Sequence, residues 1–334
     1  MTRTLIVDGN SLLNTGFHGI KNMYNGEDHI GGLYHFLNTL RKLIDEYLIT
    51  KIVVFWDGEN NTEPRKKLYP EYKLNRKKKS RSIEDIESYS KQKLRTQEYL
   101  EELYVRQATF KFCEADDCIS YYCEKAIEEE KIVLTSDRDL LQLISPTTSL
   151  HIISLNQLFR FEDKVPLDGI YIPHQNVRLV KTICGDSSDN IKGIKMVGIK
   201  SLIKIKPEIS EKKVEFEQLI NEIKNRKKIS VKENNIINGI TQHNNIDNPL
   251  EINYQIIKTG KKFLTKEAIE GVRSLLKESL DPQGRHWKNA LDLMMSDGIL
   301  NILPKTNDGW VDFVRPYLRL SRIEKDFYKK TKKN

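Results

Sequence analysis

The chain has 334 residues, of which 38% are hydrophobic and 31% charged, and these proportions fit a globular protein with an extensive charged surface. Lysine and arginine outnumber aspartate and glutamate by 55 to 47, and the formal net charge of +8 favours a polyanionic partner. No apolar run approaches the length of a membrane span, residues 1–7 lack the pattern of a signal peptide, and the cysteines form no zinc or redox motif. We therefore expect a cytoplasmic protein without a membrane partner.

Four short β-rich runs, at residues 4–7, 52–56, 132–134 and 150–153, are too continuously apolar to be half-exposed strands. Between the first two runs, apolar residues recur at helical spacing over residues 33–47. The order strand, helix, strand predicts an α/β fold with a central, mainly parallel sheet.

A strongly basic segment follows the second predicted strand. Residues 65–81 contain nine lysines and arginines, against the single acidic residue Glu71. Ser82 is placed to cap a following helix that has acidic residues in its first turn. The two tyrosines of the segment either stack on a base or pack the segment itself. The candidate nucleic-acid contacts are Arg65, Lys66, Lys67, Tyr69, Tyr72, Lys77, Lys78 and Lys79.

Acidic residues fall where the predicted strands end. Asp8 ends the first strand, Asp57 the second, and Asp137 and Asp139 follow the third. Because the carboxyl ends of parallel strands share one edge of a sheet, we expect these side chains to converge there. Such a cluster stays ionised only if cations neutralise it, and oxygen ligands select Mg²⁺ or Mn²⁺.

Two further acidic groups precede predicted helices, at residues 114–117 and 186–189. Any one of these acids could simply cap its helix. All the acidic groups together indicate a site for two divalent cations, an arrangement that hydrolyses phosphodiesters without a histidine base. The candidate metal ligands are Asp8, Asp57, Glu114, Asp116, Asp117, Asp137, Asp139, Asp186 and Asp189.

The order of these motifs resembles that of the 5′ nucleases, a family that includes flap endonucleases, bacteriophage 5′-3′ exonucleases, phage RNase H and the 5′ nuclease domain of bacterial DNA polymerase I. The resemblance covers roughly residues 4–205 and implies a PIN-like 5′ nuclease fold with a helical arch at about residues 62–107. It rests on Leu-Ile-Val-Asp8, Phe-Trp-Asp57, Tyr-Pro-Glu-Tyr-Lys73-Leu-Asn-Arg76, Glu114-Ala-Asp116-Asp117, Thr-Ser-Asp137-Arg-Asp139 and Cys-Gly-Asp186-Ser-Ser-Asp189.

The resemblance also implies roles for these residues. Lys73 and Arg76 would reach the scissile phosphate and stabilise its developing negative charge. The arch would admit a single-stranded 5′ end. Asp8, Asp57, Glu114 and Asp116 would serve chiefly one metal ion, and Asp137, Asp139, Asp186 and Asp189 the other, with Asp117 as a ligand or a partner of one.

A helix-three-turn-helix-like element for duplex DNA is implied at about residues 183–206, with Gly193, Lys195, Gly198 and Lys200 as contacts, supported by Lys204 and Lys206. Met196 stands where the family pattern has its middle glycine, which leaves K⁺ binding at this element open. We expect an α/β nuclease domain over residues 1–180 and a mostly helical, duplex-binding region over residues 181–334.

The sequence thus predicts a structure-specific 5′ nuclease, with flap endonuclease and 5′-3′ exonuclease activity on branched or 5′-ended DNA. Removal of RNA primers during phage DNA replication would add RNA–DNA hybrid as a substrate, and single-strand-binding or replication proteins as partners of a monomer. Two alternatives remain. A PIN-type ribonuclease is disfavoured by the basic segment, and a noncatalytic junction-binding protein is disfavoured by the complete set of acids.

Overall fold

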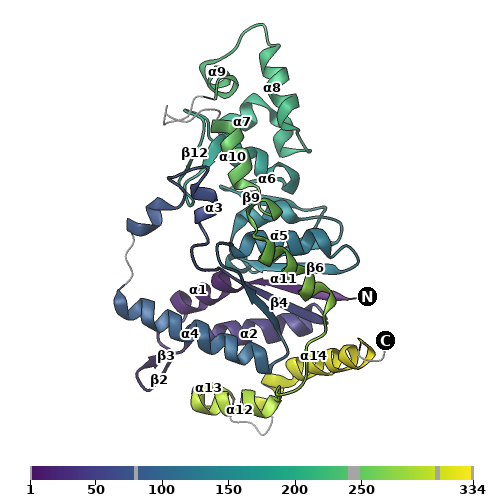
Figure 1. Ribbon diagram of the computed structural model, residues 1–334. Coiled ribbons are helices and arrows are strands. Elements are labelled where there is room, and N and C mark those ends of the chain that lie inside the picture. Colours follow the sequence, from purple (N-terminus) through teal and green to yellow (C-terminus); the bar gives the residue numbers. More distant parts are fainter. Residues whose placement is uncertain (1, 79–81, 240–248, 305–308, 332–334) are drawn as a thin grey trace.

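The computed structural model describes residues 2–78, 82–239, 249–304 and 309–331, with a six-stranded sheet at its centre (Figure 1). Neighbouring strands are parallel except β7 and β8, which confirms the predicted mainly parallel α/β sheet. The edge strands β5 and β8 were not predicted, because they are short and partly polar. In spatial order the strands are β5 (Arg106–Thr109), β4 (Lys51–Trp56), β1 (Arg3–Asp8), β6 (Glu130–Thr135), β7 (Thr148–Ile152) and β8 (Gln157–Phe159).

Helices cover both faces of this sheet. Because side chains alternate along a strand, Leu5 and Val7 of β1 face one layer and Ile6 faces the other. The first layer contains α1 (Gly9–Gly19), α2 (Gly31–Glu46) and α4 (Ile83–Glu102), and the second contains α5 (Ala115–Lys125) and α6 (Val177–Cys184). The helix predicted over residues 33–47 is α2, which extends slightly beyond the apolar repeat at its start.

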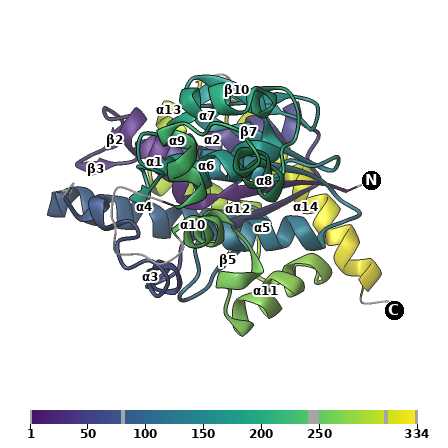
Figure 2. The same cartoon turned by 90° about the horizontal axis from the view of Figure 1, so that it is seen from above.

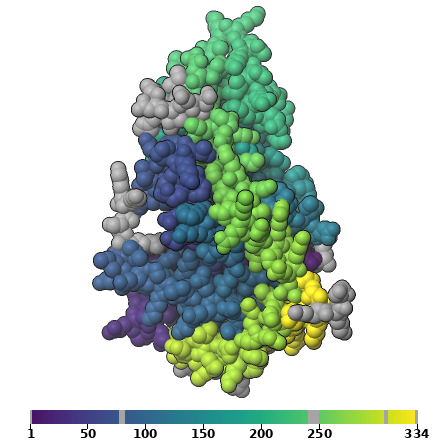
Figure 3. Space-filling model, in the orientation of Figure 1, coloured from purple at the N-terminus to yellow at the C-terminus, as the bar shows by residue number. Residues whose placement is uncertain are grey.

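The basic insertion between β4 and β5 contains α3 (Glu63–Lys66), the 3₁₀ helix η1 (Leu74–Lys78) and α4. Ser82 caps α4 as predicted, since its hydroxyl accepts a hydrogen bond from Asp85 N at 3.1 Å. The base of the insertion packs against α10 (Pro249–Ile257), as the adjoining surfaces in Figure 3 show. This packing fixes the start of the insertion beside the carboxyl edge of the sheet.

Beyond β8 the chain builds a second, largely helical part before it returns to the first. The hairpin β9 (Lys164–Leu167) and β10 (Ile170–Pro173) leads to α6, whose end connects through β11 (Gly185–Asp186) and β12 (Ile191–Lys192) to α7 (Ile199–Ile205). Next come α8 (Phe216–Lys224), α9 (Val231–Ile237) and α10. Most of the predicted polar loop at residues 242–249 lies outside the described residues.

The last helices lie back on the part that contains the sheet rather than forming a separate body (Figures 1 and 2). They are α11 (Lys266–Lys277), which packs on α5, α12 (Trp287–Ser296) on α4, α13 (Ile299–Ile302) on α12, and α14 (Gly309–Thr331) on α2. Tyr317 of α14 donates a hydrogen bond to Leu37 O at 2.7 Å. The predicted boundary at residue 180, between an α/β domain and a helical region, therefore stays a prediction. In the described ranges, no helix has the length and apolarity to span a membrane.

Candidate active site

Three carboxylates stand at the carboxyl edge of the parallel strands. Asp8 ends β1, Asp57 follows β4, and Asp137 follows β6. Because β1 pairs with both β4 and β6, the three strand ends adjoin. Asp8 is fixed from both sides, accepting hydrogen bonds from Ser11 N and Thr135 Oγ1, each at 3.0 Å. The predicted convergence of acids at this edge is observed.

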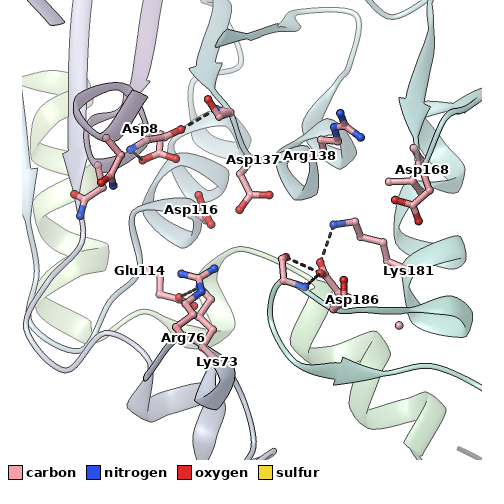
Figure 4. A pocket seen from close by; sticks show the side chains of 18 of the residues that line it. Asp8, Lys73, Arg76, Glu114, Asp116, Asp137, Arg138, Asp168, Lys181 and Asp186 are labelled. Atoms are coloured by element: carbon pink, nitrogen blue, oxygen red, sulfur yellow. Dashed lines mark hydrogen bonds and ion pairs between the residues drawn. The ribbon is translucent and has the colours of Figure 1, made fainter. Parts of the chain in front are cut away.

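The other acids of the cleft come from elements packed against this edge (Figure 4). Asp116 lies in the first turn of α5, and Asp186 ends β11. Asp57 Oδ1 accepts a hydrogen bond from Ala115 N at 2.9 Å, which fastens the start of α5 to the strand end. A cleft of about 570 Å³ results. The predicted catalytic residues that line it are Asp8, Asp57, Lys73, Arg76, Glu114, Asp116, Asp137 and Asp186.

Four of these acids, Asp8, Asp57, Asp116 and Asp137, form no ion pair with any residue that the structure describes; we call them the unpaired group. Burial and the charge of Asp57 raise the pKa of Asp8 to about 7. Burial, with Asp137 and Asp8, raises the pKa of Asp116 well above its usual range. Burial also raises the pKa of Asp137, against the opposing charge of Lys181. The carboxylates of the unpaired group therefore lie close enough to raise one another's pKa, and no ion pair with a described residue offsets this.

Glu114 is held by two cations instead. The Lys73 ammonium pairs with its carboxylate, Arg65 approaches it at 2.6 Å, and the Tyr72 hydroxyl donates to it at 3.1 Å. Burial alone would raise the pKa of Glu114, but Lys73 and Arg65 together hold it below its ordinary value. Lys73 has a left-handed backbone, φ 56°, and its N–H donates to Asp189 O at 2.9 Å. This turn brings the predicted catalytic lysine into the cleft.

Asp139 and Asp186 share a lysine that the sequence analysis did not select. The ammonium of Lys181, in the last turn of α6, pairs with both carboxylates and lies 2.8 Å from Asp186 (Figure 4). Burial would raise the pKa of Asp186, but Lys181 and two hydrogen bonds from Ser188 lower it. The position of Lys181, in the helix that leads directly into the Asp186 motif, is the signal that could have identified it.

Asp189 is buried beside the arch and does not line the cleft. Arg76 donates to it at 2.8 Å and the Tyr72 hydroxyl at 3.0 Å. Burial raises its pKa, although Lys73 and Arg76 oppose this. The metal-ligand role expected for Asp189 stays a prediction. The side chain of Arg76 is 56% exposed and faces the cleft, where a substrate can reach it.

Arg65 was predicted to contact DNA, but its side chain is only 3% exposed and lies inside the protein. Its guanidinium donates to both oxygens of Asp117, at 2.6 and 2.9 Å, and to Ile256 O at 3.1 Å. Gly260 N donates to the same carboxylate at 2.9 Å. In this arrangement Arg65 cannot reach a phosphate and Asp117 faces Arg65 rather than the cleft. Charge alone does not distinguish a surface arginine from a buried one.

The tyrosines of the arch are also buried, which supports packing rather than base stacking. The Tyr69 hydroxyl donates to Asn190 O at 3.1 Å, and Tyr72 is enclosed by Glu114 and Asp189. Of the neighbouring lysines, Lys66 pairs with Glu63 at 3.1 Å and Lys67 is exposed. The side chains of Lys77 and Lys78, and the whole of Lys79, lie outside the described residues.

The expected helix-three-turn-helix-like element is the connection from α6 to α7. A Cβ on Gly193 would lie 2.1 Å from Cys184 O, so close backbone packing requires glycine there, whereas Gly198 has open space around it. Met196 adopts φ 66° and is 58% exposed, so it takes a conformation that favours glycine.

The lysines of this element divide by exposure. Lys195, Lys200 and Lys204 are exposed and available to a duplex. Lys206 is buried and pairs with Glu222 and, at 3.2 Å, with Glu208, so the expected DNA contact does not hold for it in this arrangement.

Several residues that line the cleft were missed by the motif analysis. Arg138 lies between two motif acids, and Asp168 occupies the tip of the β9–β10 hairpin with φ 48°. The cleft also includes a polar face of α1. Its spacing, at i, i+1, i+4 and i+5, is a helical signal that could have identified it. The residues of that face are Asn10, Ser11, Asn14 and Thr15.

The donor set suits hard divalent cations, because it consists of carboxylate oxygens on buried or half-buried side chains. Nevertheless, within the described ranges no three acidic, histidine or cysteine side chains gather closely enough to hold a metal ion. Two of the candidate ligands are held by lysines in this arrangement, Glu114 by Lys73 and Asp186 by Lys181.

A parallel sheet with an acidic cleft at its carboxyl edge and a basic insertion beside that cleft defines a nuclease of the PIN-like 5′ nuclease type. The sequence model described as "5'-3' exonuclease, N-terminal resolvase-like domain" matches residues 3–165. A 5′-3′ exonuclease of Halalkalibacterium halodurans is 31% identical over 229 residues, covering 64% of this chain and 73% of that protein. The chain therefore belongs to the 5′-3′ exonuclease family.

Other similar proteins agree with this assignment. DNA polymerase I of Caldicellulosiruptor bescii is 28% identical over 217 residues, which cover 62% of this chain and 24% of that protein. The solved structure of bacteriophage T5 5′-exonuclease with bound zinc superposes with a TM-score of 0.62 at 20% identity, covering 88% of this chain and 99% of that one. At this identity the likeness to the T5 enzyme supports the fold.

Proposed function

We propose that this chain is a metal-dependent, structure-specific 5′ nuclease that hydrolyses phosphodiester bonds in branched or 5′-ended DNA. The observation that carries the proposal is the convergence of the unpaired group with Lys73 and Arg76 in one cleft. A bacteriophage T5 flap endonuclease with a similar fold was solved with DNA and metal ions, at a TM-score of 0.59 and 18% identity. The DNA and metal ions bound in that structure support both the proposed polyanionic substrate and the proposed metal requirement.

The positions of the side chains support a separate proposed task for each. Lys73 and Arg76 would bind the scissile phosphate, where fixed positive charge stabilises the anion that develops during hydrolysis. Two bound Mg²⁺ or Mn²⁺ ions would supply an activated water and stabilise the leaving oxygen. Asp8, Asp57 and Asp116, with Glu114, would hold one ion, and Asp139 and Asp186 the other. The charge of Asp137 interacts with those of both Asp116 and Asp186, so Asp137 would lie between the two ions.

The substrate follows from the surfaces beside the cleft. The basic insertion would receive a single-stranded 5′ end, and the exposed lysines of the α6–α7 connection would contact the backbone of the adjoining duplex. Because both contacts are directed at phosphates, the same cleft would accept an RNA–DNA hybrid, as primer removal requires. Flap cutting and 5′-3′ exonucleolytic cutting are then two uses of one site.

Cleavage of a 5′-labelled flap duplex in Mg²⁺ tests the proposal. We expect cutting near the junction that EDTA and Asp186→Asn abolish and that Lys73→Ala slows by about 10²- to 10³-fold, the usual effect of removing one group that stabilises a transition state. Lys125→Ala is the control, because Lys125 is exposed at the end of α5, does not line the cleft and lies outside the basic insertion. It should retain activity within about twofold.

The two alternatives give different results in the same assay. A noncatalytic junction-binding protein would bind the flap duplex tightly and cut it under none of these conditions. A PIN-type ribonuclease would cut single-stranded RNA in preference to the flap duplex. Either result would replace the proposed function.

A further inference from the structure

The acids of the cleft differ in what neutralises them. The members of the unpaired group form no ion pair with a described residue, whereas Asp139 and Asp186 share one ion-pair partner, the ammonium of Lys181. The two carboxylates come from different elements, the 3₁₀ helix η2 (Arg138–Leu143) and β11. Lys181 therefore occupies the position of a cation that bridges two ligands; Figure 4 shows its contact with Asp186.

This ion pair is shielded from water. The side chain of Lys181 is 12% exposed, and those of Asp139 and Asp186 are 12% and 6% exposed. Attraction between opposite charges is stronger at such sites than at the surface, and removing one partner leaves the other without compensation. Only another cation in the same space can replace the ammonium without leaving the two carboxylates uncompensated.

We propose that Lys181 is a built-in counter-cation for the second metal position. Its ammonium neutralises Asp139 and Asp186 until a divalent cation displaces it. The two metal ions consequently bind in order, the first at the unpaired group and the second at the Lys181 pair. This inference rests on the proposed metal-dependent function and adds a loading order to it.

The order follows from the balance of charges. A first cation held by Asp8, Asp57 and Asp116 relieves the repulsion among these carboxylates without breaking an ion pair of theirs, so it binds tightly. A second cation has to break two contacts of Lys181 before it gains the same two carboxylates, so it binds more weakly. In exchange, the metal-free cleft keeps η2 and β11 together, because Asp139 and Asp186 do not repel each other while the ammonium lies between them.

Titration of the protein with Mn²⁺ in the absence of DNA tests the loading order, by calorimetry and by the EPR signal of free Mn²⁺. Wild type should show one tight and one weaker site. Lys181→Gln should tighten the weaker site by about tenfold or more, because the competing charge is gone. Lys181→Arg should leave it weak, and Asp186→Asn should abolish it while the tight site remains.

Arg138→Gln is the matched control. Arg138 lines the same cleft and follows Asp137 directly, but it forms no ion pair with a described residue, so its removal changes the net charge equally without freeing the two carboxylates. It should tighten the weaker site by at most about twofold. If Arg138→Gln and Lys181→Gln tighten it equally, the effect is one of general charge and the inference is wrong.

The remaining outcomes separate this inference from the proposed function. Absence of any Mn²⁺ binding by folded wild type would overturn the metal-dependent function itself. Two sites in wild type, with the weaker one unchanged in Lys181→Gln, would overturn only the role of Lys181. Circular dichroism and the Tm without metal check folding, and Lys181→Met, which retains the apolar stem, takes the place of Lys181→Gln if that variant is unfolded.

Discussion

Met196 adopts φ 66° at the turn between α6 and α7, a backbone region that costs a residue with a Cβ roughly 1–2 kcal/mol. Its side chain is largely exposed and so recovers little of that cost by packing. Sequence comparison with the family pattern marked this position as a missing glycine, and the backbone shows that the turn nevertheless keeps the conformation that glycine favours.

We therefore expect Met196→Gly to raise the free energy of unfolding by about 0.5–1 kcal/mol, after the greater freedom of glycine in the unfolded chain is allowed for. Equilibrium urea denaturation measures this. Lys195→Gly is the control, since Lys195 is exposed in the same turn and is not among the residues with positive φ, and it should lose stability. A loss of stability in Met196→Gly would contradict the strain argument.

The prediction of site residues from sequence worked best where position along an element carries the information. Asp8, Asp57 and Asp137 end buried parallel strands, and that alone brings them together. It worked least well for cations. Arg65 and Lys181 are both cations near acidic motifs, yet Arg65 is enclosed by Asp117 and Lys181 lies in the cleft, because tertiary packing rather than charge decides which surface each one reaches.

At the scale of elements, Arg65 joins three parts of the fold. It extends from α3 at the base of the arch to Asp117 of α5, and it also donates to Ile256 O of α10. Phe263 lies against its guanidinium, 4.1 Å from the ring centre. A fixed Arg65 thereby holds the arch at a set distance from the first turn of α5, where the cleft acids begin.

Arg65→Met should lower the free energy of unfolding by about 3–5 kcal/mol, because it leaves the buried carboxylate of Asp117 without its counter-charge. Urea denaturation at pH 7 measures the loss. Lys66→Met, the exposed neighbour, should change stability by no more than about 0.5 kcal/mol. Equal small changes in both variants would show that the buried pair contributes nothing.

The connection between α5 and β6 depends on Glu129 in a similar way. Its carboxylate accepts hydrogen bonds from Thr4 at 2.6 Å, Lys51 at 2.9 Å and Tyr122 at 3.0 Å. Burial alone would raise the pKa of Glu129, but Lys51 and these hydrogen bonds lower it. The stabilisation is therefore fully present above the unfolded pKa of about 4.3 and is lost as the pH falls through the lower pKa of the folded state.

Glu129→Gln should consequently cost about 1–2 kcal/mol of unfolding free energy at pH 7, and the difference from wild type should shrink towards pH 3, because below its unfolded pKa Glu129 binds a proton more readily in the unfolded chain than in the fold. Glu128→Gln provides the matched control, because Glu128 is exposed one residue away. A difference that stays constant between pH 7 and pH 3 would exclude the charge of Glu129 as its cause.

For the molecule as a whole, electrostatic repulsion within the unpaired group lowers the free energy of unfolding. Mutual repulsion among buried carboxylates destabilises the metal-free fold, and a divalent cation that binds only the folded state removes it. Three of these acids are fixed to the ends of the central strands of the predicted α/β sheet. Without a metal ion, the repulsion is therefore relieved only when the whole sheet unfolds, and it affects the stability of the entire fold.

Adding Mg²⁺ should therefore raise the Tm, with a stabilisation of about 2.7 kcal/mol when the ion is present at 100 times its Kd. Sodium chloride of equal ionic strength should not reproduce the shift. Asp116→Asn should have opposite effects in the two conditions, raising the Tm without metal and reducing the response to Mg²⁺. A wild-type Tm that EDTA and Mg²⁺ leave unchanged would contradict the repulsion argument.

The return of α14 to the sheet has a practical consequence. Glu324 pairs with Arg106, the first residue of β5, so this helix runs past the amino edge of the sheet, where β1 also begins. The cleft lies at the opposite, carboxyl edge, and Figure 1 shows both marked ends of the chain on the same side of the molecule. A fluorophore or surface tether attached at either end would therefore stay clear of the cleft, which suits this protein to single-molecule observation of one cutting event at a time.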